Sequence, residues 1–235
     1  MKKIFLIIPF LFLNIYPQFN GNEFSIGVNG IYTTTAKIYL TPNSTDPVLR
    51  NASFPIEDIF SYSVDFRYRF YDAVVAGLNV GYMQATDIGP NITVFDNTGT
   101  KKINVEDGFL LIPVELSSYY ILPFSTENFK FAMGAGGGFY FGKQIRKFGD
   151  TEISTVDREN AYGIHVSVSM DYMIQPYLSI RSAMKFRDPQ FIVTSKYKDR
   201  KINYNNDVIT LAQDTFTSKI NVDGISFILG FVFHF

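Results

Sequence analysis

The segment AYGIHVSVSMDYMI, residues 161–174, alternates between apolar and polar side chains along almost its whole length. One face of an extended chain would carry the apolar set: Tyr162, Ile164, Val166, Val168, Met170, Tyr172 and Ile174. The opposite face would carry the remaining set: Gly163, His165, Ser167, Ser169, Asp171 and Met173. Successive side chains of a β-strand point to opposite faces, so this segment predicts a strand with one continuous apolar face and one polar face.

The same two-residue period recurs in other parts of the chain. In residues 60–70, FSYSVDFRYRF, it places Tyr62, Val64 and Phe66 opposite Asp65 and Arg67. Eight segments share it, at residues 24–32, 60–70, 76–82, 110–120, 131–141, 161–174, 178–186 and 225–235. Half of their positions are polar, which excludes strands buried on both faces. Because 17% of the chain is aromatic, we interpret the apolar face as facing lipid and the polar face as facing a lumen.

The connections between these segments alternate in length. Those after the second, fourth and sixth segments are short, whereas those after the first, third, fifth and seventh are long and polar. This alternation is typical of outer-membrane barrels, and an even number of strands places both ends of the chain in the periplasm. The sequence therefore predicts an all-β fold, an eight-stranded antiparallel transmembrane up-and-down β-barrel. The long connections, residues 33–58 and 188–222, are expected to contain hairpin extensions above the membrane.

Aromatic side chains gather near both ends of the predicted strands. At the ends that lead into long connections lie Tyr32, Tyr62, Tyr82, Phe141, Tyr162 and Phe186. At the ends that lead into short turns lie Phe24, Phe70, Tyr120, Phe131, Tyr172 and Phe233. Two aromatic belts at the membrane interfaces are what a transmembrane barrel predicts.

The chain begins with MKKIFLIIPFLFLNI, in which two lysines precede an apolar run at residues 4–13. The run is too short for a transmembrane helix and is typical of a secretory signal. We expect residues 1–20 to be a signal peptide, cleaved between residues 16 and 22, and residues 21–235 to form one outer-membrane barrel. The chain has no cysteine, which excludes a lipidated cysteine, disulfides and thiolate metal sites.

The glycine-rich stretch MGAGGGFYFGKQ, residues 133–144, superficially matches a phosphate-binding loop. Such a loop needs Ser or Thr after Lys143 and a helix after that, but Gln144 follows and no helical pattern appears. We interpret the stretch as a strand whose glycines, at positions 134, 136 and 138, leave room in the lumen for long side chains from other strands. In the preceding strand, Pro113 cannot donate to the ladder, so a bulge is expected there.

Charged side chains collect on the polar faces of several predicted strands. The predicted lumen polar network consists of Asp65, Arg67, Arg69, Glu115, Lys130, His165, Asp171, Arg181 and Lys185. An eight-stranded barrel is only wide enough for its own side chains to fill, so these charges are expected to pair and to close the bore. The alternative is a narrow gated path or a ligand pocket, since five cations in this set face three carboxylates.

His165 and Ser167 lie two residues apart on one predicted face, a spacing similar to that of barrel enzymes that deacylate lipid A. The next strand, YLSIRSAMKFR, offers no carboxylate to orient the histidine, and the pair faces the lumen rather than lipid. His234 has no acidic or hydroxyl neighbour in sequence. We therefore predict no catalytic residues, no metal site and no cofactor.

The run DGFLLIPVELSSYYILP followed by FKFAMGAGGGFYFGK resembles the central hairpin of the small porin-like, PorT-like outer-membrane barrels of Bacteroidetes-type bacteria. Ile112, Pro113 and Val114 carry the resemblance with the glycines of the second strand. The closing ISFILGFVFHF is similar to the terminal strand of outer-membrane barrels in general. That resemblance implies an insertion signal read by the barrel-insertion machinery, at Phe231, Phe233 and Phe235.

The sequence thus predicts a non-enzymatic protein of the bacterial outer membrane, with a structural or surface-binding role carried by long external loops. Its expected partners are outer-membrane lipid, the insertion machinery and an extracellular ligand or protein, and we expect a monomer. A net charge of −1 gives no basic surface for nucleic acid. The alternative functions are a narrow porin-like conduit for small solutes and, third, an enzyme that modifies lipid A.

Overall fold

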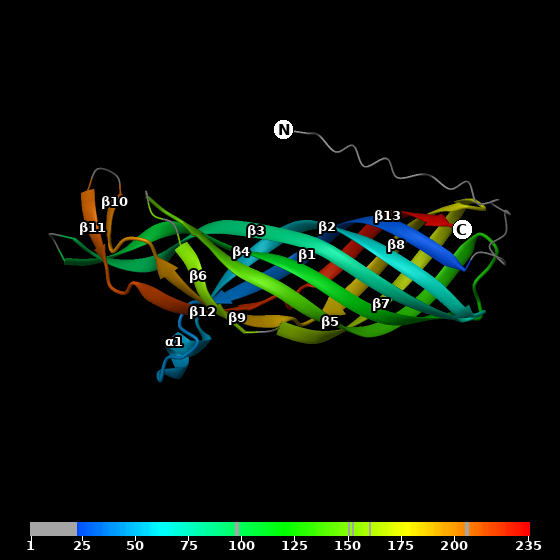
Figure 1. Ribbon diagram of the computed structural model, residues 1–235, viewed down its shortest axis with the longest axis horizontal. Coiled ribbons are helices and arrows are strands. Elements are labelled where there is room, and N and C mark those ends of the chain that lie inside the picture. Colours follow the sequence, from blue (N-terminus) through cyan, green and yellow to red (C-terminus); the bar gives the residue numbers. More distant parts are fainter. Residues whose placement is uncertain (1–22, 97–98, 150, 152, 160, 205–206) are drawn as a thin grey trace, which may run out of the picture.

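The computed structural model describes residues 23–96, 99–149, 151, 153–159, 161–204 and 207–235, so the expected signal peptide lies outside the described residues. Within them, eight antiparallel strands close into a barrel (Figure 1). They are β1 (Phe24–Tyr39), β2 (Ser53–Tyr71), β3 (Val74–Asp96), β4 (Gly99–Ile121), β5 (Phe129–Lys147), β7 (Ala161–Gln175), β8 (Leu178–Arg187) and β13 (Ile225–His234). This ring confirms the predicted fold.

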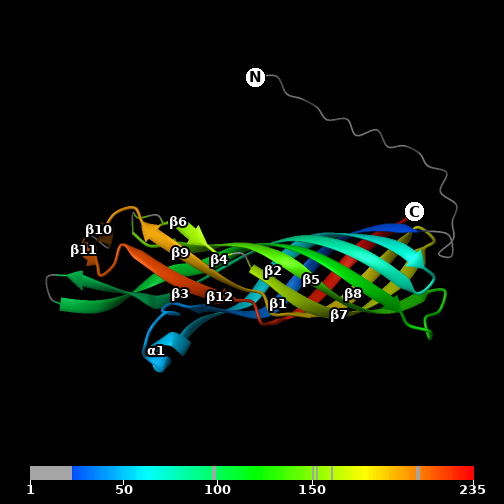
Figure 2. The same ribbon diagram turned by 60° about the horizontal axis from the view of Figure 1, so that its bottom comes forward.

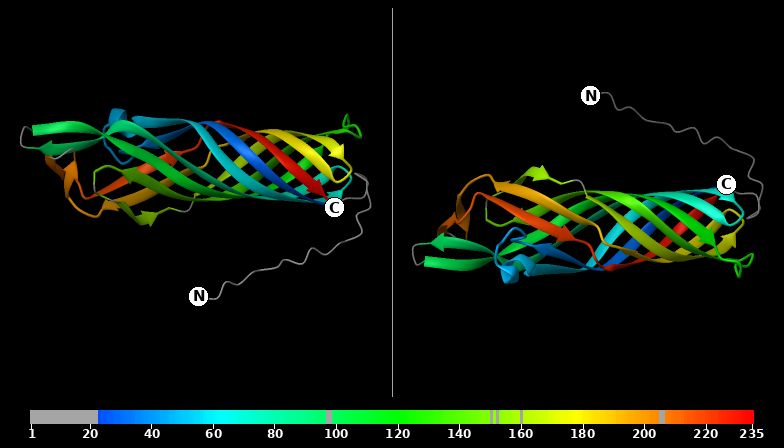
Figure 3. Two further views of the ribbon diagram at one scale, coloured as in Figure 1. Left: turned by 90° about the horizontal axis from the view of Figure 1, so that it is seen from above. Right: turned by 90° about the horizontal axis from the view of Figure 1, so that it is seen from below.

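The last strand closes the ring by pairing with the first. Val28 of β1 lies opposite Phe231 of β13, and the backbone groups of Phe24 and Phe235 exchange two hydrogen bonds of 3.0 Å. The start of β1 and the carboxyl end of β13 therefore lie side by side at one end of the barrel (Figure 3). The short turns that follow β2, β4 and β7 reach this same end, which is the periplasmic end in a barrel of this type.

At the other end, the wall continues well beyond the ring, and we call this part the external extension (Figure 2). It comprises residues 34–39, 53–59, 84–96, 99–110 and 142–147 of β1 to β5, together with α1 (Pro47–Asn51), β6 (Ile153–Arg158), β9 (Gln190–Tyr197), β10 (Lys201–Tyr204), β11 (Asp207–Leu211) and β12 (Thr215–Asn221). β12 pairs with β1 and β9, β9 pairs with β6, and β11 pairs with β10 and β3.

The hairpin extensions predicted for the two long connections are confirmed. Residues 188–222 form the hairpin arms β9 and β12, with the small hairpin β10–β11 between them. Residues 33–58 mainly prolong β1 and β2, and α1 lies between these two strands in sequence. Asp46 caps α1 by accepting a hydrogen bond of 2.8 Å from the backbone N–H of Val48.

The outer face of the ring is covered by exposed apolar side chains. These include Val28, Val64, Leu78, Leu116, Phe139, Ile164, Val166, Leu229 and Phe231. Such a continuous apolar band would be unfavourable in water, whereas it matches the lipid-facing band of a transmembrane barrel. Within the described residues, no helix is long and apolar enough to span a membrane.

The glycines of β5 give the lumen the space that the sequence predicted. A side chain at Gly138 would place its Cβ 2.9 Å from Cγ of Glu115, and one at Gly134 would collide with the ring of Tyr119. The interior beside β5 is thus occupied by long side chains from β4. The glycines are required by this packing, and the phosphate-loop interpretation has no structural basis.

The expected bulge at Pro113 is wrong. The pairs Val80–Val114 and Met83–Leu111 on either side keep one register, and β5 pairs Tyr140 with Pro113 without a shift. Gly81 lies opposite, where an added Cβ would be 2.9 Å from Cγ of the proline ring. Because a glycine makes room for the ring, the strands accommodate the proline without a change of register.

Val166→Arg tests the assignment of the outer face. Val166 is 51% exposed near the middle of β7, so the substitution would place a cation in the hydrocarbon layer. We expect a loss of about 2 to 4 kcal/mol in the free energy of unfolding from lipid. The measurement is denaturant unfolding of the protein in lipid vesicles.

Val208→Arg is the matched control, because Val208 is 62% exposed but lies on β11 at the tip of the external extension. It should leave the unfolding free energy nearly unchanged. Equal stability of Val166→Arg and the parent would show that the inside and outside faces have been assigned incorrectly.

Candidate functional site

The part of the lumen nearest the periplasmic end contains a buried cluster of ion pairs. Arg181 of β8 donates to both carboxylate oxygens of Asp171 at 2.7 Å, and its third contact, also 2.7 Å, is to Asp65 of β2. Arg67 approaches the same oxygen of Asp65 at 3.1 Å. Asn29 donates to the other oxygen of Asp65 at 2.7 Å. The two carboxylates are thus bridged by one guanidinium across the bore.

A second cluster surrounds Glu115, whose side chain is fully buried. Lys185 donates to one of its oxygens at 2.6 Å, while Tyr140 at 3.1 Å and Arg187 at 3.4 Å contact the other. The sequence predicted that Glu115 would pair with a cation of the lumen network, without specifying which one. Arg187 and Tyr140 were missed, because the predicted strand ended before Arg187 and Tyr140 lies among the aromatics of the glycine-rich segment.

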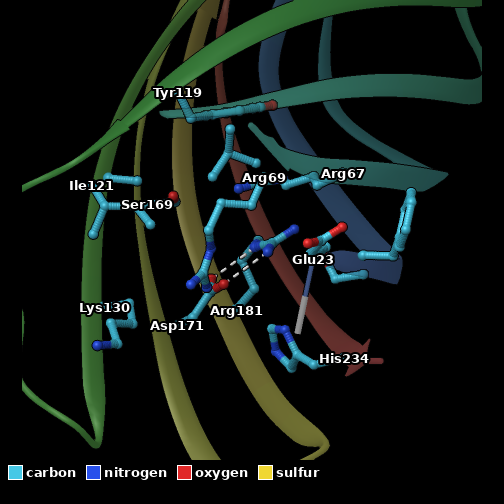
Figure 4. A pocket seen from close by; sticks show the side chains of 14 residues that line it. Glu23, Arg67, Arg69, Tyr119, Ile121, Lys130, Ser169, Asp171, Arg181 and His234 are labelled. Carbon is cyan, nitrogen blue, oxygen red and sulfur yellow. Dashed lines mark hydrogen bonds and ion pairs between the residues drawn. The ribbon is translucent and has the colours of Figure 1, made fainter. Parts of the chain in front are cut away.

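Arg69 and Lys130 lie at the periplasmic mouth of the bore. Figure 4 shows them around the Arg181–Asp171 pair, with Glu23 and His234 on the same rim. They enclose a cavity of about 60 Å³, and a second cavity of about 20 Å³ lies deeper, beside Asn29 and Arg67. Cavities of this size hold only a few water molecules. The lumen is therefore filled by its own side chains at the level of the membrane.

His165 faces the lumen as predicted, but its partner is not Ser167. Its Nε2 lies 2.7 Å from Oγ of Ser117 on β4, across the intervening strand β5. Gly136 of β5 permits this approach, since an added Cβ would lie 2.9 Å from Cε1 of the histidine. Nδ1 has no hydrogen-bond partner among the described residues. His234, for which the sequence offered no neighbour, lies 2.8 Å from Oγ of Ser179.

An apolar cluster closes the bore at the base of the external extension. Phe109 of β4 and Phe191 of β9 meet edge to face with their ring centroids 6.5 Å apart. The other buried members of this cluster are Ala36, Ile38, Ile56, Ile59, Met83, Leu111, Tyr140, Ala161, Val193, Ile220 and Val222. A charged layer within the membrane and an apolar layer above it thus obstruct the bore in succession.

Above this cluster, the external extension contains a buried ion pair that the sequence did not reveal. Arg146 of β5 contacts both carboxylate oxygens of Asp107 and donates to the hydroxyl of Tyr197 at 2.7 Å. Its guanidinium also lies over the ring of Phe216, 4.4 Å from the centroid. Asn91 donates to Asp107 at 2.8 Å. The predicted strands covered only residues 110–120 and 131–141, so they did not include Asp107 and Arg146, which are cross-strand neighbours on β4 and β5.

Burial and the carboxylate of Asp107 act together on the protonation states of Arg146 and Tyr197. Burial disfavours the charged form of Arg146, but the carboxylate of Asp107 outweighs that effect and raises the pKa of the guanidinium. Burial raises the pKa of the Tyr197 phenol, against the opposing influence of Arg146. The hydroxyl of Tyr197 therefore stays protonated near neutral pH, so it can accept from Arg146 and still donate its own proton.

A cavity of about 220 Å³ opens beside this ion pair. It is larger than either lumen cavity, and it lies outside the membrane-spanning part of the barrel. Its lining residues come from several strands and connections: Leu40, Thr41, Asn91, Ile92, Thr93, Arg146, Tyr197, Leu211, Ala212, Gln213 and Phe216. The external extension is thus a folded wall around an accessible, mostly uncharged pocket.

An antiparallel ring of eight strands in the described residues, with a continuous apolar outer band and a polar interior, defines a transmembrane β-barrel. Barrels of this type, with short turns at one end and long extensions at the other, belong to bacterial outer membranes. We therefore assign the protein to the outer membrane as an integral barrel.

Comparisons with solved structures agree with this class. The outer-membrane protein OprG of Pseudomonas aeruginosa is similar with a TM-score of 0.60 at 14% identity, covering 91% of this chain and 96% of that one. AlkL in lipid bilayers scores 0.49 at 14% identity, covering 100% and 97%. Ail of Yersinia pestis scores 0.45 at 8% identity, covering 91% and 99%. The likeness to OprG supports the fold alone.

No protein-family model matches the chain, and a search of curated protein sequences finds no match.

Glu115→Gln tests the contribution of the buried charges to stability. The substitution keeps the shape of the side chain but leaves Lys185 and Arg187 without their carboxylate. Breaking a buried pair in this way is expected to lower the unfolding free energy by about 3 to 5 kcal/mol. Unfolding in lipid vesicles measures the loss.

The matched control is Glu106→Gln in the external extension, where Glu106 contacts Lys147 at 3.6 Å with both side chains partly exposed. An exposed pair of this kind contributes at most about 1 kcal/mol. Similar small losses in both variants would contradict the assignment of Glu115 to a closed, desolvated cluster.

Proposed function

We propose that this protein is a non-conducting outer-membrane barrel that binds a ligand at the cell surface through its external extension. The observation that carries the proposal is the contrast between two parts of one barrel. The membrane-spanning bore holds paired charges with cavities of about 60 and 20 Å³, whereas the extension holds a cavity of about 220 Å³. Binding residues commonly lie on segments that a rigid barrel positions.

The runner-up function, a narrow conduit, requires the lumen to open. A solute would have to separate Arg181 from Asp65 and Asp171, then Lys185 from Glu115, and then pass the apolar cluster around Phe109. Leaving buried charges unpaired costs several kcal/mol for each pair. The five cations of the predicted network do outnumber its three carboxylates, but the contacts of Arg67, Arg181 and Lys185 link them to these carboxylates.

A lipid A enzyme is the third candidate, and the geometry disfavours it. Ser117 and His165 form a short contact that could activate a hydroxyl, but both residues are buried in the lumen. Among the residues that the structure describes, no third group contacts Nδ1 of His165 to orient the ring. Glu115, the carboxylate two residues from Ser117, is bonded to Lys185, Arg187 and Tyr140 instead. We therefore propose a non-enzymatic role.

The remaining features of the proposal come from the sequence. Phe231 and Phe233 face outward on β13, and the backbone of Phe235 pairs with that of Phe24. We propose these three phenylalanines as the signal read by the insertion machinery. We retain outer-membrane lipid as the surrounding partner, a monomeric state, no nucleic-acid partner and membership of the PorT-like group as proposals.

Conductance across planar lipid bilayers tests the closed bore. The parent protein should insert without producing steady, ohmic channels in potassium chloride, because its lumen charges are paired and the apolar cluster around Phe109 closes the bore. Liposome swelling with glycine and arabinose checks the same point for small uncharged solutes, and no swelling above empty liposomes is expected. Steady channels or rapid swelling would contradict the closed bore and would support the conduit function instead.

A further inference from the structure

The cavity of about 60 Å³ at the periplasmic mouth of the bore is lined by more cations than carboxylates. The cations are Arg67 and Arg69 of β2, Lys130 of β5 and Arg181 of β8, and the carboxylates are Glu23 and Asp171. Figure 4 shows these side chains around one space. Asp72 and Glu127 are exposed in the turns at this end and do not line the cavity. Because low-dielectric walls focus the field of charges in a cleft, this lining attracts anions from the periplasm.

Arg67 keeps hydrogen-bonding capacity that the protein does not use. Its Nε donates to Asp65 at 3.1 Å, and its guanidinium lies over the ring of Tyr119, 3.9 Å from the centroid. Among the described residues, no acceptor contacts its two Nη atoms. Arg181 differs, since all three of its guanidinium nitrogens donate to Asp171 or Asp65. The side chain of Arg67 is 11% exposed and lines both lumen cavities, so its Nη groups can donate to a ligand there.

Two serine hydroxyls lie at the same cavity. Ser25 of β1 is the cross-strand neighbour of Arg67, and Ser169 of β7 lies two residues from Asp171 on the same face of its strand. Neither hydroxyl has a hydrogen-bond partner among the described residues, and neither oxygen is enclosed by protein. An arginine fork and hydroxyl donors are the groups that proteins use to bind carboxylate and phosphate oxygens.

We propose that this cavity binds one phosphate or carboxylate group of a periplasmic molecule. Arg67 would donate to its oxygens through the Nη groups, and Ser25 and Ser169 would donate through their hydroxyls. Asp171 does not compete for Arg67, because Arg181 holds both of its oxygens. A single oxyanion group occupies the space of a few water molecules, which matches the size of the cavity. The inference goes beyond the surface-binding function and does not depend on it.

Isothermal titration calorimetry of the protein purified from outer membranes into octyl glucoside tests this site. The protein is titrated at pH 7 with inorganic phosphate and, separately, with acetate, while potassium chloride keeps the ionic strength constant. We expect saturable binding at one site for at least one of the two anions, and the tighter anion identifies the group that the site prefers. Titration with potassium chloride alone measures any general effect of ions and should show no saturable binding.

Four variants locate the binding. Arg67→Lys keeps the charge but removes the fork, and it should weaken binding by about tenfold or more. Ser169→Ala removes a hydroxyl without a protein partner, so it should weaken binding without lowering thermal stability. Ser167→Ala is the matched control, because Ser167 lines the deeper cavity and not the mouth, and it should alter neither property. Glu23→Gln removes a carboxylate from the rim and should tighten binding.

The inference is overturned if neither phosphate nor acetate binds in a saturable manner, or if potassium chloride reproduces the heat, which would mean an adventitious ion only. Binding that is unchanged in both Arg67→Lys and Ser169→Ala, or that falls equally in Ser167→Ala, would also overturn it. If Arg67→Lys does not fold, Ser169→Ala and Glu23→Gln decide the question, because the proposal requires them to change the affinity in opposite directions.

Discussion

Charged side chains pair across a bore that is too narrow for water to screen them. The other features of the barrel follow from this pairing. Lipid outside the ring requires apolar side chains at every second position, so the polar half of each strand must face inward. Eight strands leave space only for those side chains. The charged groups of the interior pair with one another: Arg181 contacts both Asp171 and Asp65, and Lys185 contacts Glu115.

The same constraint explains why much of the fold could be predicted from the sequence. The alternation in residues 161–174 is local, because each side chain's face follows from its position in the strand. It correctly placed Asp65, Glu115, Asp171, Arg181 and Lys185 on the inner face, and the narrow bore then implied their contacts. The glycines of β5 were interpreted correctly for the same reason, since large neighbours in a filled lumen require small ones.

What could not be predicted depends on register between distant segments. Asp107 and Arg146 meet only because β4 and β5 continue beyond the membrane. There the inner face carries apolar residues such as Ile103 and Val105, so the sense of the alternation is the reverse of that in the membrane. Ser117 reaches His165 across β5 because Gly136 lies between them, and Gly81 removes the need for a bulge at Pro113. Each of these contacts joins two strands whose relative alignment no local pattern specifies.

Solid-state NMR of the unmodified protein in lipid bilayers can detect the pairing of charges in the lumen directly. A carbon–nitrogen recoupling experiment reports whether the guanidinium of Arg181 contacts the carboxylate of Asp171, and water-edited spectra report how quickly water magnetisation reaches that guanidinium. We expect a persistent contact, consistent with N···O distances of 2.7 Å, together with slow transfer from water. An absent contact with rapid transfer from water would show a hydrated, open bore and contradict a lumen closed by paired charges.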